Sequence, residues 1–343
     1  MPAIPPPLLP PMQPHDTILV TGAAGMIGSA LVWALNRQGY DNIILTDRLG
    51  CDERWRNLVP LRFADYLDAD ALWDQLDGPA LRAVRWVFHL GACSATTEKN
   101  AAYLMENNFR YSRRLAEWAL AGGRRFVYAS SAATYGNGEA GMADGQEHLS
   151  AYRPLNMYGY SKHLFDLHAR QRGWFDRIVG LKYFNIFGPN EDHKADMRSV
   201  VHKATGQIRD SGSVSLFRSH HPDYRDGEQQ RDFLYVKDAV AMTLHLARTP
   251  NAAGIYNIGS GQAATWIDLV TPIFNALNLP VRIEFVDMPE VLRGKYQYHT
   301  CANVQRLLDS GWNAANHSLA GAVQDYVTRY LVPDRRLGDL PEP

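Results

Sequence analysis

The sequence predicts an α/β protein of the Rossmann type, with a doubly wound parallel sheet and a smaller, interwoven α/β substrate domain. Short apolar strands alternate with helical stretches over the first half of the chain, which indicates a parallel sheet covered on both faces. A glycine-rich turn follows the first of these strands directly. After about Asn185 the alternation breaks, and charge-rich, loop-like stretches take its place.

The strands and helices of the first half have the lengths that such a sheet requires. The first expected strand covers 17–20 and is a short, mainly apolar run, as a buried parallel strand should be. Apolar residues with helical spacing predict a helix over 27–38. The other expected strands are 42–46, 84–90, 125–129 and 177–184 in the first half, and 232–236 and 255–258 in the second. Loops are expected over 188–198 and 218–231.

The length of 343 residues exceeds one ordinary domain of about 150 residues, so we expect two domains behind an N-terminal extension. Seven prolines among the first fourteen residues predict that 1–15 is disordered or polyproline-like. The NAD(P)-binding domain is expected to comprise 16–184, 232–258 and 298–314. The substrate-binding domain is expected to comprise 185–231, 259–297 and 315–335. The site should lie in the crevice between them, at the carboxyl ends of the strands.

Charge and cysteine content argue against several classes of protein. The formal net charge is −1, so no overall field attracts nucleic acid or an anionic membrane. No apolar run reaches the roughly 18–20 residues that span a bilayer, and the proline-rich start does not resemble a secretory signal. The three cysteines are widely spaced, without metal-ligand spacing, which is typical of a reducing compartment. We therefore expect a cytoplasmic enzyme without a metal site.

The glycine turn has the spacing of a dinucleotide-binding motif. Gly22, Gly25 and Gly28 lie between the first strand and the first helix, where glycine permits a tight turn and a close approach to a pyrophosphate. The helix that follows directs free N–H groups at the phosphates. Asp47 ends the second strand, near the roughly 20-residue distance expected of a carboxylate that binds ribose. These features together predict NAD or NADP as cofactor.

The choice between the two cofactors stays open at the level of the residues. Asp47 would repel a 2′-phosphate and so favours NAD. Arg48 and Arg54 follow it closely, and either would pair with that phosphate if it is not simply solvated. We expect NADP, with NAD as the alternative.

A tyrosine and a lysine are spaced as an acid/base pair. Tyr158 and Lys162 lie four residues apart and share one face of a helix. A cationic lysine beside a phenol lowers the pKa of the phenol and makes it a usable base. Upstream, an expected strand ends in small hydroxylic residues, of which Ser131 or Thr134 would hydrogen-bond the alcohol being oxidised.

The chain has the glycine turn, the hydroxylic strand end and the Tyr-Lys pair in this order. In this it resembles the extended short-chain dehydrogenase/reductase family, which includes nucleotide-sugar epimerases and dehydratases. The resemblance runs from about residue 16 to 331. It is carried by the segments 91–98, 106–108, 128–136, 154–162, 183–189 with His193-Lys194, and 292–297. It implies an NADP-dependent isomerase that acts on ADP-heptose in the supply of lipopolysaccharide core precursors, and a homopentamer.

The resemblance also implies roles for individual residues. Tyr158 and Lys194 would be the two acid/base residues, assisted by Ser131 and Lys162. The cofactor would be lined by Gly22, Gly25, Met26, Ile27, Gly28, Asp47, Arg48, Arg54, Leu90, Gly91, Ala92, Cys93, Ser94, Asn107, Tyr158, Lys162, Ile186 and Lys194. The nucleotide sugar would be held by Ser131, Asn185, Asp196, Phe217, Arg231 and Tyr296.

Inversion of a carbon explains why two proton carriers are expected. Hydride must leave one face of the carbonyl intermediate and return to the other, so the intermediate must rotate. The oxygen then occupies a different place in each epimer, and one acid/base group cannot readily serve both. At carbon six of a heptose the intermediate is an exocyclic aldehyde, for which rotation about one bond suffices.

The chain departs from the family pattern at two places. A lysine usual near Ala69 is absent, since the chain has Asp68-Ala69-Asp70, and this weakens the expectation of NADP. The loop 219–230 is longer than expected and contains His220 and His221.

Three rival functions share part of the pattern. A 4,6-dehydratase needs an added acid and base, usually at the positions of Ala132 and Ala133. A UDP-sugar 4-epimerase does not predict the His193-Lys194 segment. A non-catalytic binding protein would not need the Tyr-Lys pair.

Overall fold

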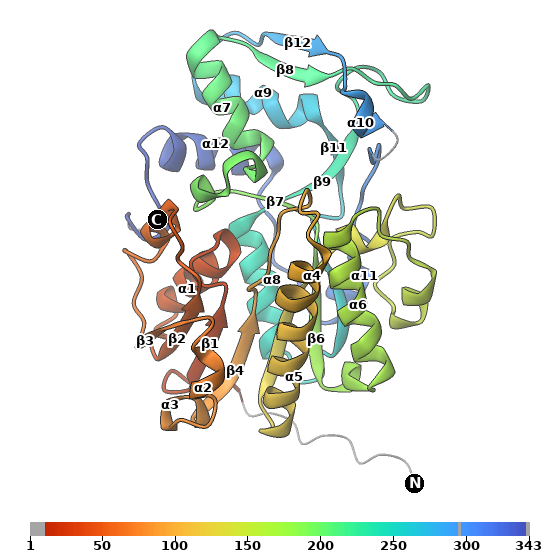
Figure 1. Ribbon diagram of the computed structural model, residues 1–343. Helices are drawn as coiled ribbons and strands as arrows, with labels where there is room; N and C mark the ends of the chain where they lie inside the picture. Colours follow the sequence, from red (N-terminus) through yellow and green to blue (C-terminus); the bar gives the residue numbers. More distant parts are fainter. Residues whose placement is uncertain (1–10, 294–295, 341–343) are drawn as a thin grey trace.

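The computed structural model describes residues 11–293 and 296–340, and its largest sheet has seven parallel strands (Figure 1). The strand order is β10-β6-β5-β4-β1-β2-β3. Their bounds are β1 (Thr17–Thr21), β2 (Ile43–Asp47), β3 (Asp65–Asp68), β4 (Val84–His89), β5 (Arg125–Ser131), β6 (Ile178–Tyr183) and β10 (Gly254–Ile258). This arrangement confirms the predicted Rossmann-type class.

The strand order reverses at β1, which creates the crevice expected in a doubly wound sheet. β1 pairs with β2 on one side and β4 on the other, so Thr21 lies opposite both Thr46 and His89. The chains leaving β1 and β4 therefore diverge to opposite faces of the sheet. Ligands of such sheets bind where the strand order reverses, beyond the carboxyl ends of the strands.

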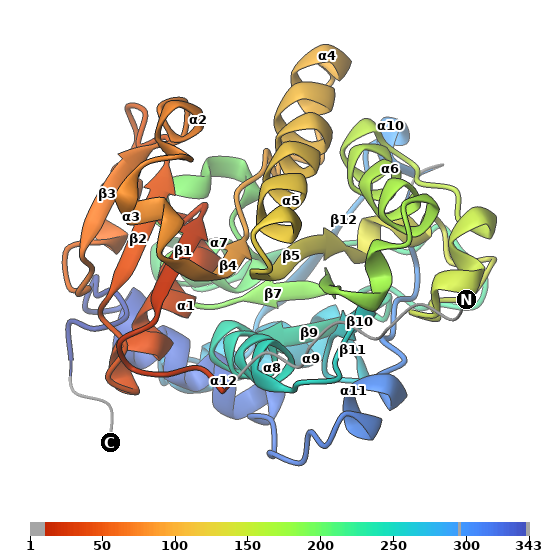
Figure 2. The ribbon, with the colours of Figure 1, turned by 90° about the horizontal axis from the view of Figure 1, so that it is seen from below.

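Helices cover both faces of the sheet (Figure 2). α1 (Met26–Arg37) packs against α8 (Val236–Arg248) on one face. α5 (Tyr111–Ala121) and α6 (Met157–Gln171) cover the other face and contact β5. α5 continues α4 (Ala101–Leu104) through a π-helical turn, η2 (Met105–Arg110). Two short helices, α2 (Leu72–Gln75) and α3 (Pro79–Arg82), connect β3 to β4.

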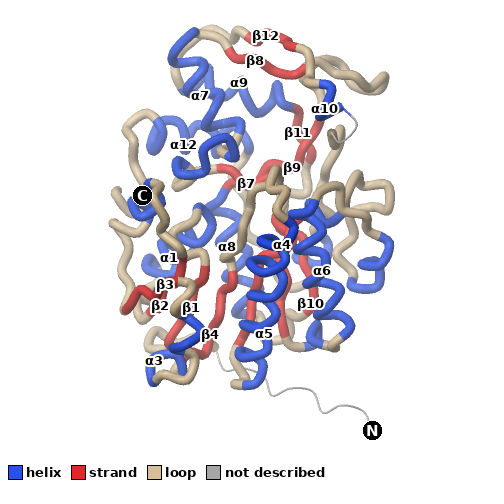
Figure 3. Tube along the Cα trace, in the orientation of Figure 1, coloured by secondary structure: helices blue, strands red, loops and turns tan. Residues whose placement is uncertain are grey.

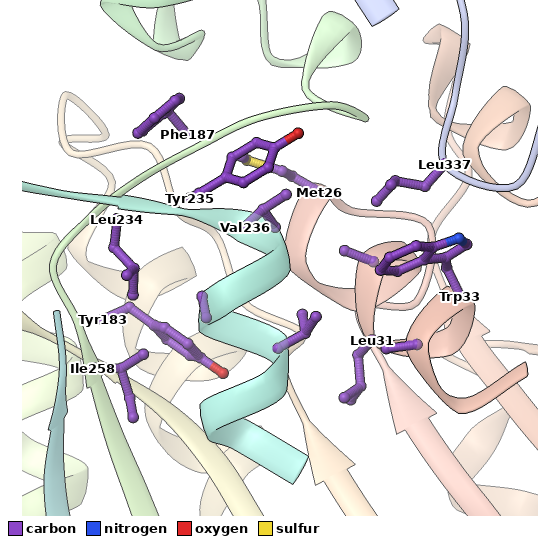
Figure 4. Close-up of a cluster of buried hydrophobic side chains, with 14 of the residues drawn as sticks. Met26, Leu31, Trp33, Tyr183, Phe187, Leu234, Tyr235, Val236, Ile258 and Leu337 are labelled. Carbon is purple, nitrogen blue, oxygen red and sulfur yellow. The ribbon is translucent and has the colours of Figure 1, made fainter. Parts of the chain in front are cut away.

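Apolar side chains from both halves of the chain fill the space around α1 and α8 (Figure 4). Leu31 of α1 and Val236 of α8 are fully buried there. The Tyr183 hydroxyl, also buried, finds a partner in Thr243 Oγ1 at 2.8 Å. Burying each large apolar side chain contributes roughly 1.5–3 kcal/mol, so this cluster joins late segments of the chain firmly to the first helix.

A smaller part lies over the carboxyl ends of the strands (Figures 1 and 3). It contains the sheet β11-β9-β7 and the parallel pair β12-β8. The strands are β7 (Asn185–Phe187), β8 (Val214–Phe217), β9 (Gln230–Tyr235), β11 (Ala263–Thr265) and β12 (Ile283–Val286). The helices of the remaining chain are α7 (Val200–Ser211), α9 (Trp266–Ala276), α10 (Glu290–Arg293), α11 (Gln305–Asp309) and α12 (Leu319–Tyr326).

The observed elements differ from the expected ones in a few places. β3 was not predicted, because this four-residue edge strand is only partly buried and lacks an apolar run. Within the expected loop 188–198, residues Asp192–Met197 form a 3₁₀ helix, η6. β9 pairs with β7 and β11 rather than with the large sheet. The division of the chain into two domains stays a prediction.

Parts of two sequence-based expectations fall outside the described residues. Most of the proline-rich segment 1–15 does, although Met12 within it is buried and accepts a hydrogen bond from the Tyr40 hydroxyl. Residues 294 and 295, in the segment 292–297, also lie outside. None of the described helices is long and apolar enough to cross a membrane.

Candidate functional site

A cavity of about 490 Å³ opens at the carboxyl ends of β1, β4 and β5, where the strand order reverses. It brings together the glycine turn, the end of β2, the turn after β4, and the start of α6. The expected residues that line it are Gly22, Gly25, Met26, Ile27, Gly28, Asp47, Arg54, Leu90, Gly91, Ala92, Cys93, Ser94, Ser131, Tyr158, Lys162, Ile186 and Lys194. A smaller adjoining cavity is lined by Arg48 and Asn107 and shares Asp47 and Arg54 with the first.

The glycine turn has the shape that a bound pyrophosphate requires. Gly22 adopts φ +67°, and a Cβ atom there would lie 2.6 Å from Gly91 Cα. The turn and the loop after β4 are therefore in contact, which only glycine allows. α1 begins at Met26, and its N-cap, Gly25, has no side chain to occupy the free N–H groups of the first turn. These N–H groups border the cavity, as a phosphate-binding helix end does.

Asp47 braces the glycine turn as well as facing the cavity. Its Oδ2 accepts from the Ala24 backbone N–H at 2.9 Å, and its Oδ1 accepts from the Arg48 N–H at 2.7 Å. Burial raises the pKa of this carboxyl, while the backbone hydrogen bonds oppose the rise. A ribose hydroxyl would add a further donor to this carboxylate.

Both arginines considered for a 2′-phosphate already have acidic partners. Arg48 donates from Nε and Nη2 to Asp70, at 3.1 and 2.5 Å, and from Nη1 to Asn107 Oδ1 at 2.7 Å. Arg54 donates to Asp52, and its Nη1 lies 3.7 Å from Asp47 Oδ1. Neither is simply solvated. A phosphate at this place would compete with these carboxylates for the guanidinium groups.

Tyr158 and Lys162 project from the first two turns of α6. The helix begins at Met157, and the side chain of the preceding Asn156 caps it by accepting from the Gly159 N–H at 2.7 Å. Lys162 is buried and donates from Nζ to the Ala129 carbonyl at 2.8 Å. Burial lowers its pKa to about 8. The lysine is therefore held by the end of β5, next to Ser131.

The expected lowering of the Tyr158 pKa is not found in the protein without its ligands. Burial raises this pKa, since a phenolate loses hydration inside the cavity. The neighbouring Ser131, which lines the same cavity, opposes that rise in the Tyr158 pKa, whereas Lys162 is not among the groups that shift it. The group that favours the phenolate is therefore Ser131 at the end of β5.

Lys194 lines the same cavity from a different element. It belongs to η6, and its Nζ lies 3.9 Å from Glu191 Oε2 and 3.8 Å from Met26 Sδ. Glu191 is fully buried and accepts from the Ser199 N–H at 2.6 Å and from the Tyr326 hydroxyl at 3.0 Å. The loop that carries Lys194 is thus anchored on α7 and α12.

The remaining substrate-binding candidates do not line this cavity. Arg231 is buried next to Tyr296, with its guanidinium carbon 5.0 Å from the ring centre. Within the described residues it has no carboxylate partner, and burial lowers its pKa. Asn185 lies on β7, Asp196 is exposed in η6, and Phe217 ends β8 with 37% exposure. The structure brings only Arg231 and Tyr296 of this group together.

Sequence reasoning missed several residues that shape the site. Tyr103, His193 and Phe184 line the cavity. Asn108 is fully buried in η2 and bridges two parts of the site: it accepts from the Cys93 N–H at 2.8 Å and donates to Ser161 Oγ at 3.0 Å. π-Helical turns of this kind often accompany functional sites, but their location is not visible in a helical sequence pattern.

The chain matches known proteins over most of its length. Residues 18–259 match the model of the NAD dependent epimerase/dehydratase family. ADP-L-glycero-D-manno-heptose-6-epimerase from Nitratidesulfovibrio vulgaris is 51% identical over 314 residues, covering 91% of this chain and 97% of that protein. The enzyme of the same name from Pseudomonas aeruginosa is 41% identical over 326 residues, covering 90% and 97%.

A solved structure shows the same similarity in three dimensions. The crystal structure of the Helicobacter pylori ADP-L-glycero-D-manno-heptose-6-epimerase superposes with a TM-score of 0.75 at 27% identity, covering 93% of this chain and 99% of that one. Fold and comparisons define a nicotinamide-dependent enzyme. The chain belongs to the NAD dependent epimerase/dehydratase family, and it is an epimerase.

Proposed function

We propose that the protein interconverts ADP-D-glycero- and ADP-L-glycero-β-D-manno-heptose by transient oxidation at carbon six. Relatives that are 41–51% identical over at least 90% of the chain bear the name of this activity. The single structural observation that supports it best is the pair Tyr158 and Lys194. These two proton carriers come from different elements, α6 and η6, and line one cavity beside the glycine turn.

Two proton carriers suit a reaction that inverts a carbon. A bound nicotinamide dinucleotide would supply the hydride acceptor and donor for the sugar carbon. In one direction Tyr158 accepts the hydroxyl proton of one epimer as its carbon is oxidised. After rotation about one bond, Lys194 donates a proton to the aldehyde oxygen in its second position as the carbon is reduced, and the reverse reaction exchanges these two roles. Each group acts at its own location, so the ADP-sugar need not leave the cavity.

The other site residues have supporting roles. Ser131 stabilises the ionised form of Tyr158, and Lys162 binds the nicotinamide ribose and adds positive charge to the cavity. The residues that line the two cavities hold the cofactor. Arg231 pairs with the diphosphate of the substrate, which would neutralise a buried guanidinium. Tyr296 packs beside it, and Asn185, Asp196 and Phe217 contact the nucleotide sugar.

We further propose NADP as the cofactor. Arg48 and Arg54 border the cavity next to Asp47, where the 2′ position of the ribose would lie. NAD is the alternative, since both guanidinium groups are paired with aspartates. On the basis of the family resemblance, we also propose a homopentamer that works in the cytoplasm, in the supply of lipopolysaccharide core precursors.

Substitution of the two proton carriers tests the proposed reaction. Tyr158→Phe and Lys194→Met should each lower the rate of ADP-heptose epimerisation, followed by NMR, by at least about 100-fold, the usual size of an acid/base contribution. Both variants should keep the cofactor bound. The nucleotide released on denaturation, identified by absorbance and mass, should be NADP. Lys99→Met, the same change at an exposed lysine, serves as the control.

Three outcomes would contradict parts of the proposal. Near-normal epimerisation by Lys194→Met would exclude two proton carriers. Turnover of UDP-galactose without turnover of ADP-heptose would assign the chain to another nucleotide-sugar epimerase of this family. Release of NAD instead of NADP would reverse the cofactor assignment.

A further inference from the structure

A buried ion pair lies directly behind the end of β5. Lys182 of β6 donates from Nζ to Asp166 Oδ2 at 2.7 Å, and both side chains are completely inaccessible. Asp166 lies on α6, one turn after Lys162 and two turns after Tyr158. The pair therefore ties the helix that carries the acid/base residues to the centre of the sheet.

Asp166 uses both oxygens on β5 as well. Its Oδ1 accepts from the Tyr128 hydroxyl and its Oδ2 from Ser130 Oγ, each at 2.8 Å. With Lys182, the carboxylate thus has three donors in the interior. Such saturation is what allows a buried charge to persist, because an unpaired carboxylate there would be very costly.

The second hydrogen bond of Lys182 leads to the catalytic serine. Lys182 Nζ donates to Thr134 Oγ1 at 2.6 Å, and Thr134 Oγ1 donates to the Ser131 carbonyl at 2.7 Å. Because the ammonium group can only donate, the direction of the Thr134 hydroxyl is settled: it must donate to the carbonyl. Thr134 is also completely buried, so it does not face the substrate alcohol, for which it had been an alternative to Ser131.

The chain of contacts ends at the residue that opposes the rise in the Tyr158 pKa. Ser131 is the last residue of β5, and its Oγ caps the 3₁₀ turn η3 (Ala132–Tyr135) by accepting from the Ala133 N–H at 3.1 Å. Its backbone carbonyl is held by Thr134. Both groups of Ser131 are therefore anchored within this turn. The turn packs against α6 next to Tyr158, since a Cβ atom at Gly159 would lie 2.7 Å from the Ala133 carbonyl oxygen, and Ser131 and Tyr158 line the same cavity.

We propose that Thr134, held by the Lys182–Asp166 pair, is a positioning residue that keeps Ser131 aligned with Tyr158. This inference rests on the proposed function, in which Tyr158 transfers the proton. A buried ion pair is weak evidence for stability, because apolar residues of similar size often stabilise a core as well or better. Here the pair orients a hydroxyl group, because Lys182 donates to Thr134 Oγ1. An apolar residue in place of Lys182 would leave the Thr134 hydroxyl without the donor that orients it.

The experiment compares Thr134→Val with Thr134→Ser, each in the wild-type protein and in a Ser131→Ala background. Val removes the hydroxyl at nearly constant volume, whereas Ser keeps it. Thr134→Val should lower kcat by roughly 10- to 100-fold with the KM for ADP-heptose changed less than about twofold. Thr134→Ser should stay within about threefold of wild type in kcat.

The pH profile and the double substitution separate positioning from simple structural support. In Thr134→Val the acid limb of the kcat profile should move to higher pH, because a displaced Ser131 no longer opposes the rise in the Tyr158 pKa. In the Ser131→Ala background, Thr134→Val should cause less than about a twofold further loss, since its target is already gone. Thr205→Val, which removes a buried hydroxyl from α7, is the matched control and should change neither quantity.

The opposite results would overturn the inference. An equal loss in both backgrounds, or a lowered melting temperature with an unmoved pH profile, would show that Thr134 only supports the fold. If the wild-type protein does not epimerise ADP-heptose, the proposed function fails, and crystal structures then test the inference separately. Ser131 Oγ within hydrogen-bond distance of Tyr158 Oη in Thr134→Val would still overturn it.

Discussion

Two arginines at the edge of the candidate cofactor cavity are each paired with an aspartate. Arg48 is paired through two nitrogens with Asp70, and Arg54 with Asp52. Asp70 lies next to Ala69, where a lysine had been expected from the family pattern. A carboxylate in this place attracts the cation that a 2′-phosphate would need. We therefore expect the preference between NADP and NAD to depend on Asp70 as well as on the two arginines.

Removal of the Asp70 charge should increase the preference for NADP. In Asp70→Asn the Arg48 guanidinium is no longer held by a carboxylate, so it can pair with the phosphate. We expect the ratio of the NAD and NADP dissociation constants to rise by roughly two- to fivefold, the range of a solvent-exposed ion pair. Equilibrium titration of cofactor-free protein measures it.

The control for that change is Asp74→Asn. Asp74 is exposed on α2 and has no ion pair in the described part of the chain, so this variant loses the same charge without releasing Arg48. An equal rise in both variants would indicate a general effect of charge and contradict the specific role of Asp70.

At the scale of elements, buried contacts of the loop between β7 and α7 determine the position of Lys194. Glu191 and Asn190 are both fully buried at its start. Ala195, directly after Lys194, adopts φ +47°, a conformation that non-glycine residues rarely adopt. The buried Glu191 carboxylate joins this loop to the N-terminus of α7 and to α12. The position of Lys194 therefore depends on elements more than a hundred residues apart.

Loss of the Glu191 charge should disturb the position of Lys194 more than loss of one hydrogen bond to Glu191. Glu191→Gln removes the charge that accepts from the Ser199 N–H, the Ser199 hydroxyl and the Tyr326 hydroxyl, and turns one of the two oxygens into a donor, whereas Tyr326→Phe only removes one hydroxyl. We expect Glu191→Gln to lower the free energy of unfolding by about 2–4 kcal/mol and kcat at least tenfold. Tyr326→Phe should cost about 1 kcal/mol, with kcat within threefold of wild type.

Urea unfolding and NMR-monitored epimerisation measure these two quantities. The cofactor should remain bound in both variants, because the glycine turn is untouched. Equal losses of kcat in the two variants would show that Glu191 acts through packing alone.

At the scale of the whole molecule, a buried histidine links the centre of the large sheet to the helices that cover it. His89 ends β4, and its Nδ1 and Nε2 lie 2.7 Å from Thr21 Oγ1 and 2.8 Å from Ser112 Oγ. Burial lowers its pKa to about 3. Burial disfavours the charged ring, and the neutral ring donates to one hydroxyl and accepts from the other.

This histidine should make the protein acid-sensitive. Between pH 6.5 and about 3 the unfolded chain binds a proton at His89 that the folded chain does not. Folding stability contributed by this group is therefore complete above about pH 6.5 and is lost as the pH falls. At pH 5 the expected loss is about 2 kcal/mol.

Urea unfolding at pH 7 and pH 5, in wild type and in His89→Gln, measures this contribution. The decrease between the two pH values should be about 2 kcal/mol larger in wild type, because glutamine does not titrate. Other acid-labile groups, including His193, are common to both proteins and cancel in the comparison. Equal decreases would show that His89 does not cause the sensitivity.

The sequence by itself determined the class of fold, the glycine turn and the Tyr158–Lys162 pair. These features depend on residues close together in the chain, where strand length, helical spacing and turn chemistry follow from local sterics. For the same reason the short edge strand β3 was missed, since a partly buried strand of four residues has little apolar pattern.

Only the tertiary structure decided what each of these residues touches. The partners Asp70 of Arg48, Asp166 of Lys182 and Glu191 near Lys194 lie on other elements or are ordinary polar residues in the sequence. Hydrogen bonds and ion pairs act over about 3 Å in space, irrespective of distance along the chain. Only the folded molecule therefore shows that burial raises the pKa of Tyr158 and that Ser131 opposes this rise.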